Sequence, residues 1–446
     1  MNLVEHPTVK KIQEAGPGPG IPRECQRLDA GWLRTLALES GADDAGVVSV
    51  ERPELDPDRS DIVSHFPWAK SLLSFVCRTN REPIRNPARS ISNLEFHTTG
   101  HHVNEVARKI VNALQERGVR AVNPAMGFPM EMHRFPEKIW AISHKNVAVA
   151  AGLGQMGIHR NVIHPKFGNF ILLGTVVIDA AIDTESRPID YNPCLECKLC
   201  VAVCPVGAIG ADGHFNFSAC YTHNYREFMG GFTDWVEQIA DSKNARDYRK
   251  RVSDPESASM WQSLSFEANY KSAYCMAVCP AGEDVIRPFL EDRKSFLDGQ
   301  VRPLQQKPET VYVTAGSDAE RHVERRFPNK RTKRVGSGLR PGSIRGFLNG
   351  LPLTFQRGAS EGIDAAYHFT FTGEEPAEAT VVIRDRTVRV EDGRHGKADL
   401  HITADSRAWL DFVAKNRSLA GALLARKIRL RGSPKHLLNF AKCFPS

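Results

Sequence analysis

The sequence contains no long hydrophobic run. None of its apolar stretches approaches the roughly 18 uninterrupted residues that a bilayer-spanning helix needs. The first 14 residues are polar and of mixed charge, without the basic-then-apolar order of a signal peptide. We therefore expect a cytoplasmic protein with no membrane span.

Cysteine is scarce outside one region of the chain. Of ten cysteines, seven lie between Cys194 and Cys279, and only Cys25, Cys77 and Cys443 lie elsewhere. This distribution does not fit a disulfide framework and is typical of a reducing compartment. A chain of 446 residues is long enough for two or three domains with buried cores.

A strong charge imbalance is also absent, since the net charge is +7. Much of this excess lies between Arg321 and Arg345, a stretch with a single aromatic residue, Phe327. A nucleic-acid-binding arm would need a clustered basic face. Because this stretch runs directly into a glycine- and proline-rich segment, we interpret residues 301–342 as a solvated basic linker and expect no nucleic-acid partner.

The most informative pattern is C-x2-C-x2-C-x3-C-P, which begins at Cys194. This spacing wraps three thiolates around one iron–sulfur cluster and sends the fourth to a second cluster. A second run ends in the same C-x3-C-P pattern at Pro280, and one further cysteine lies between the two runs. A structural zinc site is the alternative, although zinc motifs use paired C-x2-C blocks. The predicted metal ligands are Cys194, Cys197, Cys200, Cys204, Cys220, Cys275 and Cys279.

The region before these cysteines predicts alternating strands and helices. Residues 45–50 and 71–77 are short apolar runs typical of buried strands. Apolar residues recur with helical spacing over 103–114, which predicts an amphipathic helix. This alternation favours an α/β core.

A glycine-rich turn lies between this region and the cysteines. Gly152, Gly154 and Gly157 satisfy G-x-G-x-x-G, and Asp179 lies where a ribose-binding acid would be expected in a nicotinamide enzyme. However, Pro165 and a following glycine interrupt the stretch where a Rossmann fold needs a helix. A tight turn with closely packed backbone is the alternative explanation.

The order of these elements resembles the epoxyqueuosine reductase and reductive dehalogenase superfamily over about residues 30–290. The resemblance implies a nitroreductase-like α+β core that holds a corrinoid such as cobalamin, with an inserted two-cluster ferredoxin-like module. It also implies a low-potential electron donor, ferredoxin or flavodoxin. The matching residues are Ala151–Gly154, Gly157, Arg160, Asn161, Pro165, Phe167, Gly168, Leu172–Gly174 and the cysteines. Of these, Gly152, Gly154, Gly157, Asn161, Phe167 and Gly168 would line the corrinoid.

The same resemblance implies how the cysteines divide between two clusters. Cys194, Cys197 and Cys200 would hold one cluster with Cys279, whereas Cys204, Cys220 and Cys275 would hold the other. The second set lacks a fourth cysteine because Ser272 stands at the position that this family commonly gives to cysteine. The candidates for the open position are Ser272, His223 and Cys443, and a three-iron cluster is the alternative.

The proton donor of the epoxyqueuosine reductases, an Asp before the glycine turn, has no counterpart here. Glu137 is the nearest carboxylate, and His144 is the nearest group that titrates near neutrality. We take both as candidate catalytic residues, with ordinary structural roles as the alternative. Without the Asp, a queuosine precursor is not the expected substrate.

Two further regions suggest substrate-related roles. The aromatic-rich insertion 214–270 is either a lid or a small helical core. Residues 367–403 predict a meander of four strands. The last hundred residues resemble the sterol carrier protein 2-like domain, an α+β fold with an apolar tunnel, which implies a hydrophobic small molecule or lipid as ligand. The alternative is that these apolar residues only fill a core.

The sequence therefore predicts an iron–sulfur, corrinoid-dependent reductase that acts on a hydrophobic organic substrate. The alternative function is a non-catalytic electron-transfer protein whose carboxy-terminal domain binds a lipid or partner. The predicted divisions are a flexible leader (1–28), a corrinoid reductase-like core (29–185), a ferredoxin-like module (186–300), the basic linker (301–342) and a sterol-carrier-like domain (343–446).

Overall fold

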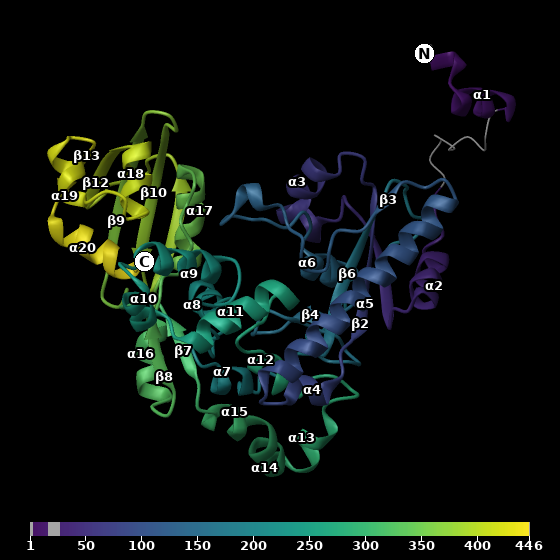
Figure 1. Cartoon of the computed structure of the whole chain (residues 1–446), viewed down its shortest axis with the longest axis horizontal. Helices are drawn as coiled ribbons and strands as arrows, with labels where there is room; N and C mark the ends of the chain where they lie inside the picture. The colour runs from purple at the N-terminus through teal and green to yellow at the C-terminus, as the bar shows by residue number, and fades with distance from the viewer. Residues whose placement is uncertain (1–2, 17–26, 446) are drawn as a thin grey trace.

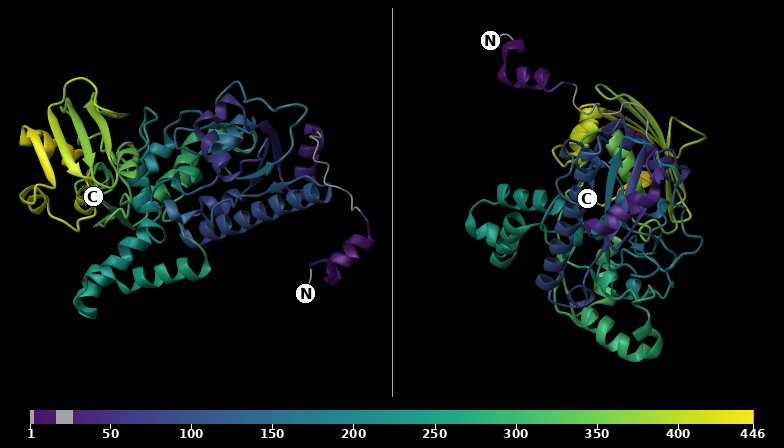
Figure 2. Two further views of the ribbon diagram at one scale, coloured as in Figure 1. Left: turned by 90° about the horizontal axis from the view of Figure 1, so that it is seen from above. Right: turned by 90° about the vertical axis from the view of Figure 1, so that its right-hand side faces the viewer.

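The computed structural model describes residues 3–16 and 27–445. A four-stranded sheet and a five-stranded sheet lie at opposite ends of the molecule, and the cysteine-bearing helices lie between them (Figures 1 and 2). Within the described ranges, no helix combines the length and apolar character needed to cross a bilayer. Residues 1–2 and 17–26 of the predicted leader, including Cys25, lie outside these ranges.

Within the predicted flexible leader (1–28), residues 3–5 and 7–14 are helical. They form η1 (Leu3–Glu5) and α1 (Pro7–Glu14). The His6 imidazole accepts a hydrogen bond from the backbone N–H of Thr8, and Pro7 occupies the first helical position, where its missing N–H is not needed. Local capping therefore starts this helix.

The amino-terminal domain contains an antiparallel sheet between two layers of helices. Its elements are α2 (Ala30–Ser40), β1 (Asp44–Ser49), η2 (Pro53–Leu55), α3 (Asp56–His65), β2 (Ser71–Arg78), α4 (Arg81–Arg85), α5 (Arg89–Glu116), β3 (Ala121–Val122), η3 (Met132–Arg134), α6 (His144–Ala150), β4 (Gln155–Met156), β5 (Val162–Ile163) and β6 (Ile171–Ile178). The sheet order is β1-β2-β6-β3. The two predicted strands and the predicted helix are confirmed as β1, β2 and part of α5.

Both faces of this sheet are covered. Helices α2 and α5 contribute to the core on one face, whereas α3 and α6 contribute to the core on the other. Because β2 and β6 lie in the middle, they are buried on both faces and read as continuous apolar runs. Every neighbouring pair in the sheet is antiparallel, so the alternation of strands and helices does not produce parallel βαβ units here.

The central part consists of short helices around the cysteines. They are α7 (Leu199–Val203), α8 (Phe217–Asn224), α9 (Gly230–Ala240), α10 (Ala245–Arg251), α11 (Asp254–Phe266), α12 (Tyr274–Ala277), α13 (Arg287–Glu291), α14 (Arg293–Phe296), η4 (Leu297–Val301) and α15 (Arg302–Gln306). Within the aromatic insertion, Tyr225, Phe228 and Tyr270 contact one another. This part of the insertion therefore forms a small aromatic core.

The predicted linker is instead a folded unit. Strands β7 (Thr310–Val313) and β8 (Arg331–Arg334) pair in parallel and are joined by α16 (Asp318–Arg326). Val311 and Val313 are buried in the same cluster as Cys204. The linker prediction was wrong because many of the basic residues lie on exposed faces of this unit, which otherwise covers the cysteine-bearing helices.

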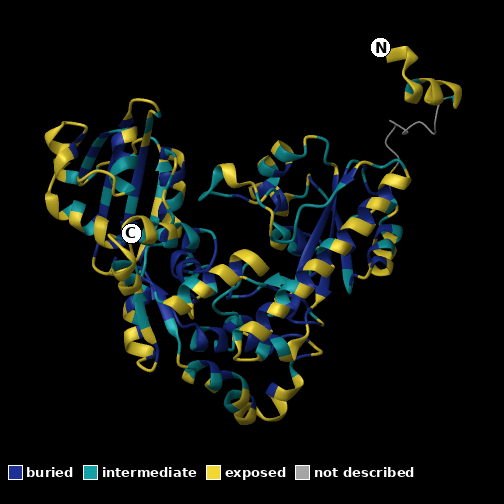
Figure 3. Ribbon diagram, in the orientation of Figure 1, coloured by how far each residue is buried: buried dark blue, intermediate teal, exposed yellow. Residues whose placement is uncertain are grey.

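The carboxy-terminal domain has a sheet of order β11-β10-β9-β12-β13 with helices packed against it. Its elements are α17 (Ile344–Thr354), β9 (Ala365–Thr372), β10 (Ala377–Arg384), β11 (Thr387–Asp392), β12 (Leu400–Asp405), α18 (Ser406–Val413), α19 (Leu419–Leu424), β13 (Ile428–Gly432) and α20 (Pro434–Cys443). The first three strands form the predicted meander, but β12 pairs in parallel with β9. Aromatic rings of Phe347, Phe369 and Trp409 pack against one another in its core. The strands of this sheet contain long buried stretches (Figure 3).

Candidate functional site

Four of the predicted metal ligands converge on one pocket. Cys194, Cys197, Cys200 and Cys279 line it together with His159 of the amino-terminal domain. Its empty volume is about 280 Å³, part of which is open to solvent. Burial raises the pKa of the Cys279 thiol to about 12, and the neighbouring Cys197 and Cys194 act in the same direction. These are the four residues that the resemblance assigned to one cluster.

The backbone around this pocket is curled so that closely spaced thiols share it. Glu196 and Lys198 both have positive φ angles, 48° and 62°, which non-glycine residues rarely adopt. Helix α7 begins directly after Lys198 and carries Cys200 in its first turn. The fourth thiol, Cys279, comes from the chain that follows α12, and α12 packs against α7.

The remaining three thiols form a second group. Burial raises the pKa of Cys220, and the charges of Cys204 and Cys275 raise it further. Burial likewise raises the pKa of Cys275 to about 11, with Cys204 as its strongest neighbouring charge. All three lie in or against one buried cluster, which also contains Cys200 of the first group. Over the ranges that the structure describes, no three His, Cys, Asp or Glu side chains are arranged to hold a single metal ion.

The structure separates the three candidates for the open position of the second group. Cys443 is fully buried in the core of the carboxy-terminal domain, so this candidate was wrong. The Nδ1 atom of His223 accepts a hydrogen bond from the backbone N–H of Tyr312. Ser272 remains in the loop that leads to Cys275. Within the described residues, the Nε2 atom of His223 is buried without a hydrogen-bond partner. The incomplete set of thiols stays a prediction, with Ser272 and His223 as the remaining candidates for the open position.

Sequence reasoning missed a lysine beside the second group. The Nζ atom of Lys145 donates hydrogen bonds to the carbonyl oxygen of Arg160 at 2.7 Å and to Oδ1 of Asn161 at 3.1 Å. The surrounding protein lowers the pKa of Lys145 by desolvation, whereas the nearby Cys275 and Cys220 act to raise it. In the sequence, the only indication of a role for Lys145 is that it directly follows His144, a candidate catalytic residue.

Two of the predicted cofactor-binding glycines allow neighbouring backbone segments to pack closely. A Cβ atom at Gly152 would lie 2.3 Å from the carbonyl oxygen of Arg187, and one at Gly154 would lie 2.3 Å from that of Ile163. The turn follows helix α6 and leads into the β4–β5 pair, so the arrangement is not the strand–turn–helix of a dinucleotide fold. The nicotinamide alternative was therefore wrong.

The other residues of this predicted set lie around the junction with the central helices. Gly157 packs against the side chains of Ile163 and His159. Phe167 is buried and stacks on His164, with ring centres 4.6 Å apart. A Cβ atom at Gly168 would lie only 2.0 Å from the carbonyl oxygen of Ala281. Among these residues, Asn161 is the one that contacts Lys145.

The two predicted catalytic residues are engaged in structural contacts. His144 hydrogen-bonds to Thr175 through Nδ1 and to the carbonyl oxygen of Ala125 through Nε2, and burial lowers its pKa. The Oε1 atom of Glu137 accepts a hydrogen bond of 3.0 Å from the hydroxyl of Ser343, at the start of α17. Glu137 therefore links the amino-terminal and carboxy-terminal domains.

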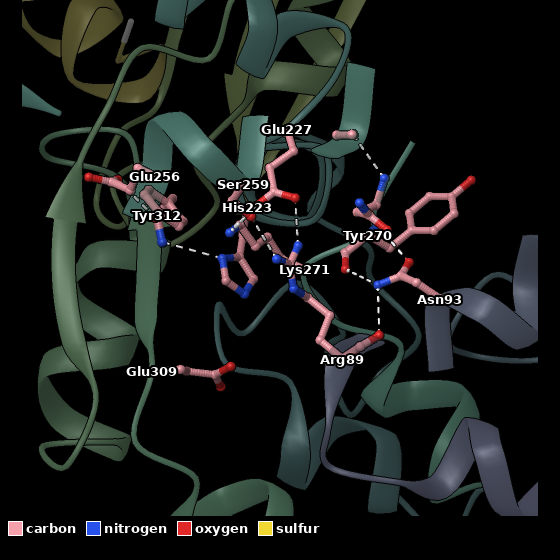
Figure 4. Close-up of polar contacts among 12 residues, drawn as sticks. Arg89, Asn93, His223, Glu227, Glu256, Ser259, Tyr270, Lys271, Glu309 and Tyr312 are labelled. Atoms are coloured by element: carbon pink, nitrogen blue, oxygen red, sulfur yellow. Dashed lines mark hydrogen bonds and ion pairs between the residues drawn. The ribbon is translucent and has the colours of Figure 1, made fainter. Parts of the chain in front are cut away.

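A buried ionic network fixes the insertion to α5 (Figure 4). Glu227 accepts hydrogen bonds from Arg89 at 2.6 Å and from Ser259 at 2.5 Å, and it also pairs with Lys271. Asn93 and Tyr270 exchange hydrogen bonds beside this network. Because Lys271 lies four residues before Cys275, the network also fixes the chain that leads into the second group of thiols.

Comparison with known proteins supports both parts of the resemblance. The model of the "SCP-2 sterol transfer family" matches residues 355–445, and that of the "4Fe-4S binding domain" matches residues 187–210. Epoxyqueuosine reductase of Prochlorococcus marinus is 28% identical over 203 residues, which cover 44% of this chain and 59% of that protein. The enzyme of Gloeobacter violaceus is 30% identical over 193 residues, covering 42% and 52%.

The chain joins an epoxyqueuosine reductase-like part to an SCP-2-like domain. This confirms the fusion that the sequence predicted. The chain spans little more than half the length of these two curated relatives. Among solved structures, a B12-dependent reductive dehalogenase has a TM-score of 0.38 at 14% identity, covering 69% of this chain and 39% of that one. An epoxyqueuosine reductase solved with a tRNA-Tyr stem loop has a TM-score of 0.32 at 16% identity, covering 43% and 56%.

Proposed function

We propose that this chain is a cytoplasmic iron–sulfur reductase that carries low-potential electrons to a hydrophobic organic substrate. The observation that supports this function best is the division of seven thiols into one group of four and one group of three. Thiolates are the ligands of iron–sulfur clusters, and the clusters, when bound, supply one-electron transfer. The sequence similarity to epoxyqueuosine reductases supports an oxidoreductase.

The two thiol groups differ in their surroundings, and this difference suggests the order in which electrons pass through them. The first group borders a pocket that is partly open to solvent, so we assign it to the side that receives electrons from ferredoxin or flavodoxin. The second group lies near Lys145 of the amino-terminal domain. We therefore assign it to the side that faces the substrate-reducing centre, for which the resemblance suggests a corrinoid in a nitroreductase-like core.

Lys145 has a defined role in this proposal. Its Nζ atom is held by a carbonyl oxygen and by the Asn161 amide oxygen beside Cys220 and Cys275. Desolvation lowers the pKa of Lys145, and negative charge on the neighbouring thiolates favours its protonated form. Net charge and hydrogen bonding set the reduction potential of a cluster. A fixed positive charge stabilises the reduced form, so Lys145 would raise the potential of the second centre.

Metal analysis of anaerobically purified protein tests the proposal. We expect iron and sulfide for two clusters, and a Cys279→Ser variant should lose about half of the iron because it removes one ligand of the first cluster. Cys443→Ser is the matched control, since this buried cysteine lies in the carboxy-terminal core. Zinc in place of iron, or full iron retention in Cys279→Ser, would contradict the proposal.

A second measurement tests the corrinoid. The visible spectrum of the protein after anaerobic incubation with cobalamin should show bound corrinoid, and cobalt should co-purify with iron in a fixed ratio. Replacement of Asn161 by Ala should weaken this binding without changing the iron content. If cobalamin does not bind while both clusters are present, the corrinoid part of the proposal is wrong and the cluster part stands.

A further inference from the structure

Arg85 is a buried cation in the core that surrounds the first group of thiols. Its side chain, at the end of α4, is only 9% exposed. The guanidinium carbon lies 5.2 Å from the ring centre of Phe170 and 5.8 Å from that of Phe296, and both rings are buried. Arg85 therefore lies against two aromatic rings in the interior of the molecule.

Two nitrogen atoms of this guanidinium have no acceptor. Among the residues that the structure describes, neither Nε nor Nη2 of Arg85 has a hydrogen-bond partner, and both atoms are shielded from solvent. The third nitrogen, Nη1, lies 3.5 Å from Oε1 of Glu82, a side chain that is 80% exposed. Because water screens an exposed ion pair, Glu82 does little to neutralise the guanidinium.

The charge of Arg85 cannot be removed by loss of a proton. A guanidinium stays protonated in proteins, and an isolated charge is costly to bury. Contact with aromatic faces offsets only part of this cost. Arg85 therefore needs a further negatively charged partner.

The first group of thiols lies close to Arg85. Helix α4 packs against α12, and the chain that leaves α12 carries Cys279. The buried core around Phe170 also contains Val278, which directly precedes Cys279. Burial lowers the pKa of Arg85, whereas the charges of Glu82 and Cys279 act to raise it. A negatively charged group held by these thiols would therefore be the partner that Arg85 needs.

We propose that Arg85 is the internal counter-charge of the first iron–sulfur cluster and raises its reduction potential. This inference rests on the proposed function. A cube held by four thiolates is an anion, and it gains one more negative charge when it is reduced. A fixed positive charge nearby stabilises the reduced form more than the oxidised form. A higher potential at this centre would favour electron entry from a low-potential donor.

An exposed arginine near the same thiols offers a matched comparison. Burial raises the pKa of Cys197, and the charge of Arg293 is among those that act to lower it. Unlike Arg85, Arg293 is exposed to solvent. Water screens its charge, so Arg293 should affect the cluster much less than Arg85 does.

Redox titration of the full-length, anaerobically purified protein, followed by EPR, tests the inference. The signal of the first cluster is the one that Cys279→Ser removes. Arg85→Met removes the charge and keeps an apolar side chain between the rings. One charge within about 10 Å of another changes an equilibrium at least about tenfold in protein, so the midpoint potential should fall by at least about 59 mV. Arg85→Lys should keep most of the parental potential, and Arg293→Met should change it much less.

Iron analysis of the parent chain separates the inference from the proposed function. Absence of the two clusters would contradict that function. With both clusters present, the inference is overturned by an unchanged potential in Arg85→Met, by equal falls in Arg85→Met and Arg85→Lys, or by an equal shift of both clusters. If Arg85→Met does not hold the first cluster, retention of that cluster in Arg85→Lys supports the need for a positive charge, and its loss in both variants overturns it.

Discussion

Gly168→Ala should break the junction between the amino-terminal domain and the cysteine-bearing helices. The backbone of Gly168 faces that of Ala281 and Gly282, which directly follow Cys279 and Pro280. Two backbone hydrogen bonds reinforce this junction, from Glu283 N–H to the carbonyl oxygen of Pro165 and from Asp284 N–H to that of Lys166. A side chain at position 168 would push apart two chains that must lie in contact.

The cost of this substitution has two parts. Gly168 has φ of +64°, a left-handed conformation that costs an L-residue about 1–2 kcal/mol. The added Cβ would also lie 2.0 Å from the carbonyl oxygen of Ala281, about 1.4 Å short of the 3.4 Å at which ordinary contact begins. Inserting a methyl group into a packed site costs about 1–3 kcal/mol. We expect a total loss of about 2–5 kcal/mol.

Gly316→Ala separates these two parts. Gly316 has φ of +73°, but nothing lies within 4 Å of the Cβ position, so this variant should lose only the conformational part. Urea unfolding followed by circular dichroism gives both losses, and iron analysis shows whether the shift of Ala281 also displaces Cys279. The reasoning is refuted if Gly168→Ala is no less stable than Gly316→Ala and keeps all of its iron.

Two further predictions concern the second thiol group and the acid stability of the fold. Ser272→Cys should complete the family pattern before Cys275. If the second cluster has three irons, this variant should contain about one more iron atom and give a changed EPR signal. Identical iron content and EPR signals in both proteins would show that Ser272 is not at the open position. Burial alone would raise the pKa of Glu256, but hydrogen bonds from Lys333, Ser253 and Tyr312 outweigh it and lower the pKa to about 2. Its contribution to stability, about 3 kcal/mol, is complete above about pH 4.5 and is lost as the pH falls toward 2. Glu256→Gln should therefore flatten the pH dependence of unfolding in this range, whereas the exposed Glu39→Gln should not; equal slopes in both variants would contradict this assignment.

The sequence predicted the features that depend on local pattern. Helical spacing identified α5, and apolar runs identified β1 and β2. The family resemblance implied one set of four cysteines, and these four line one pocket. The linker prediction for residues 301–342 failed because the many basic residues of this stretch were taken as a sign of a solvated segment. In α16 the basic residues lie on the exposed side, while Val323 is buried. Ser317 caps the start of this helix, and a serine at this position could have indicated a helix from the sequence.

Residues whose roles depend on distant partners could not be assigned from the sequence. Glu137 was a candidate proton donor because it is a carboxylate before the glycine turn, yet its partner is Ser343, 206 positions away. Cys443 was a candidate ligand only because it is a cysteine, and it belongs to the core of a different domain. Lys145 lacked any motif, and only folding brings it near Cys220 and Cys275.

The carboxy-terminal domain is attached to both other parts of the molecule, which constrains how it can act. Glu137 contacts the start of α17, and the Gln356 amide, which is only 2% exposed, donates a hydrogen bond to Ser218 of α8. Arg357 pairs with Asp212 nearby. Separating the domain would break the hydrogen bond to Ser218 and the one that Gln356 accepts from the backbone N–H of Asp318, each of which contributes about 1 kcal/mol. A ligand of this domain would therefore be presented from a fixed position beside the central helices, in contrast to delivery by a domain on a flexible tether.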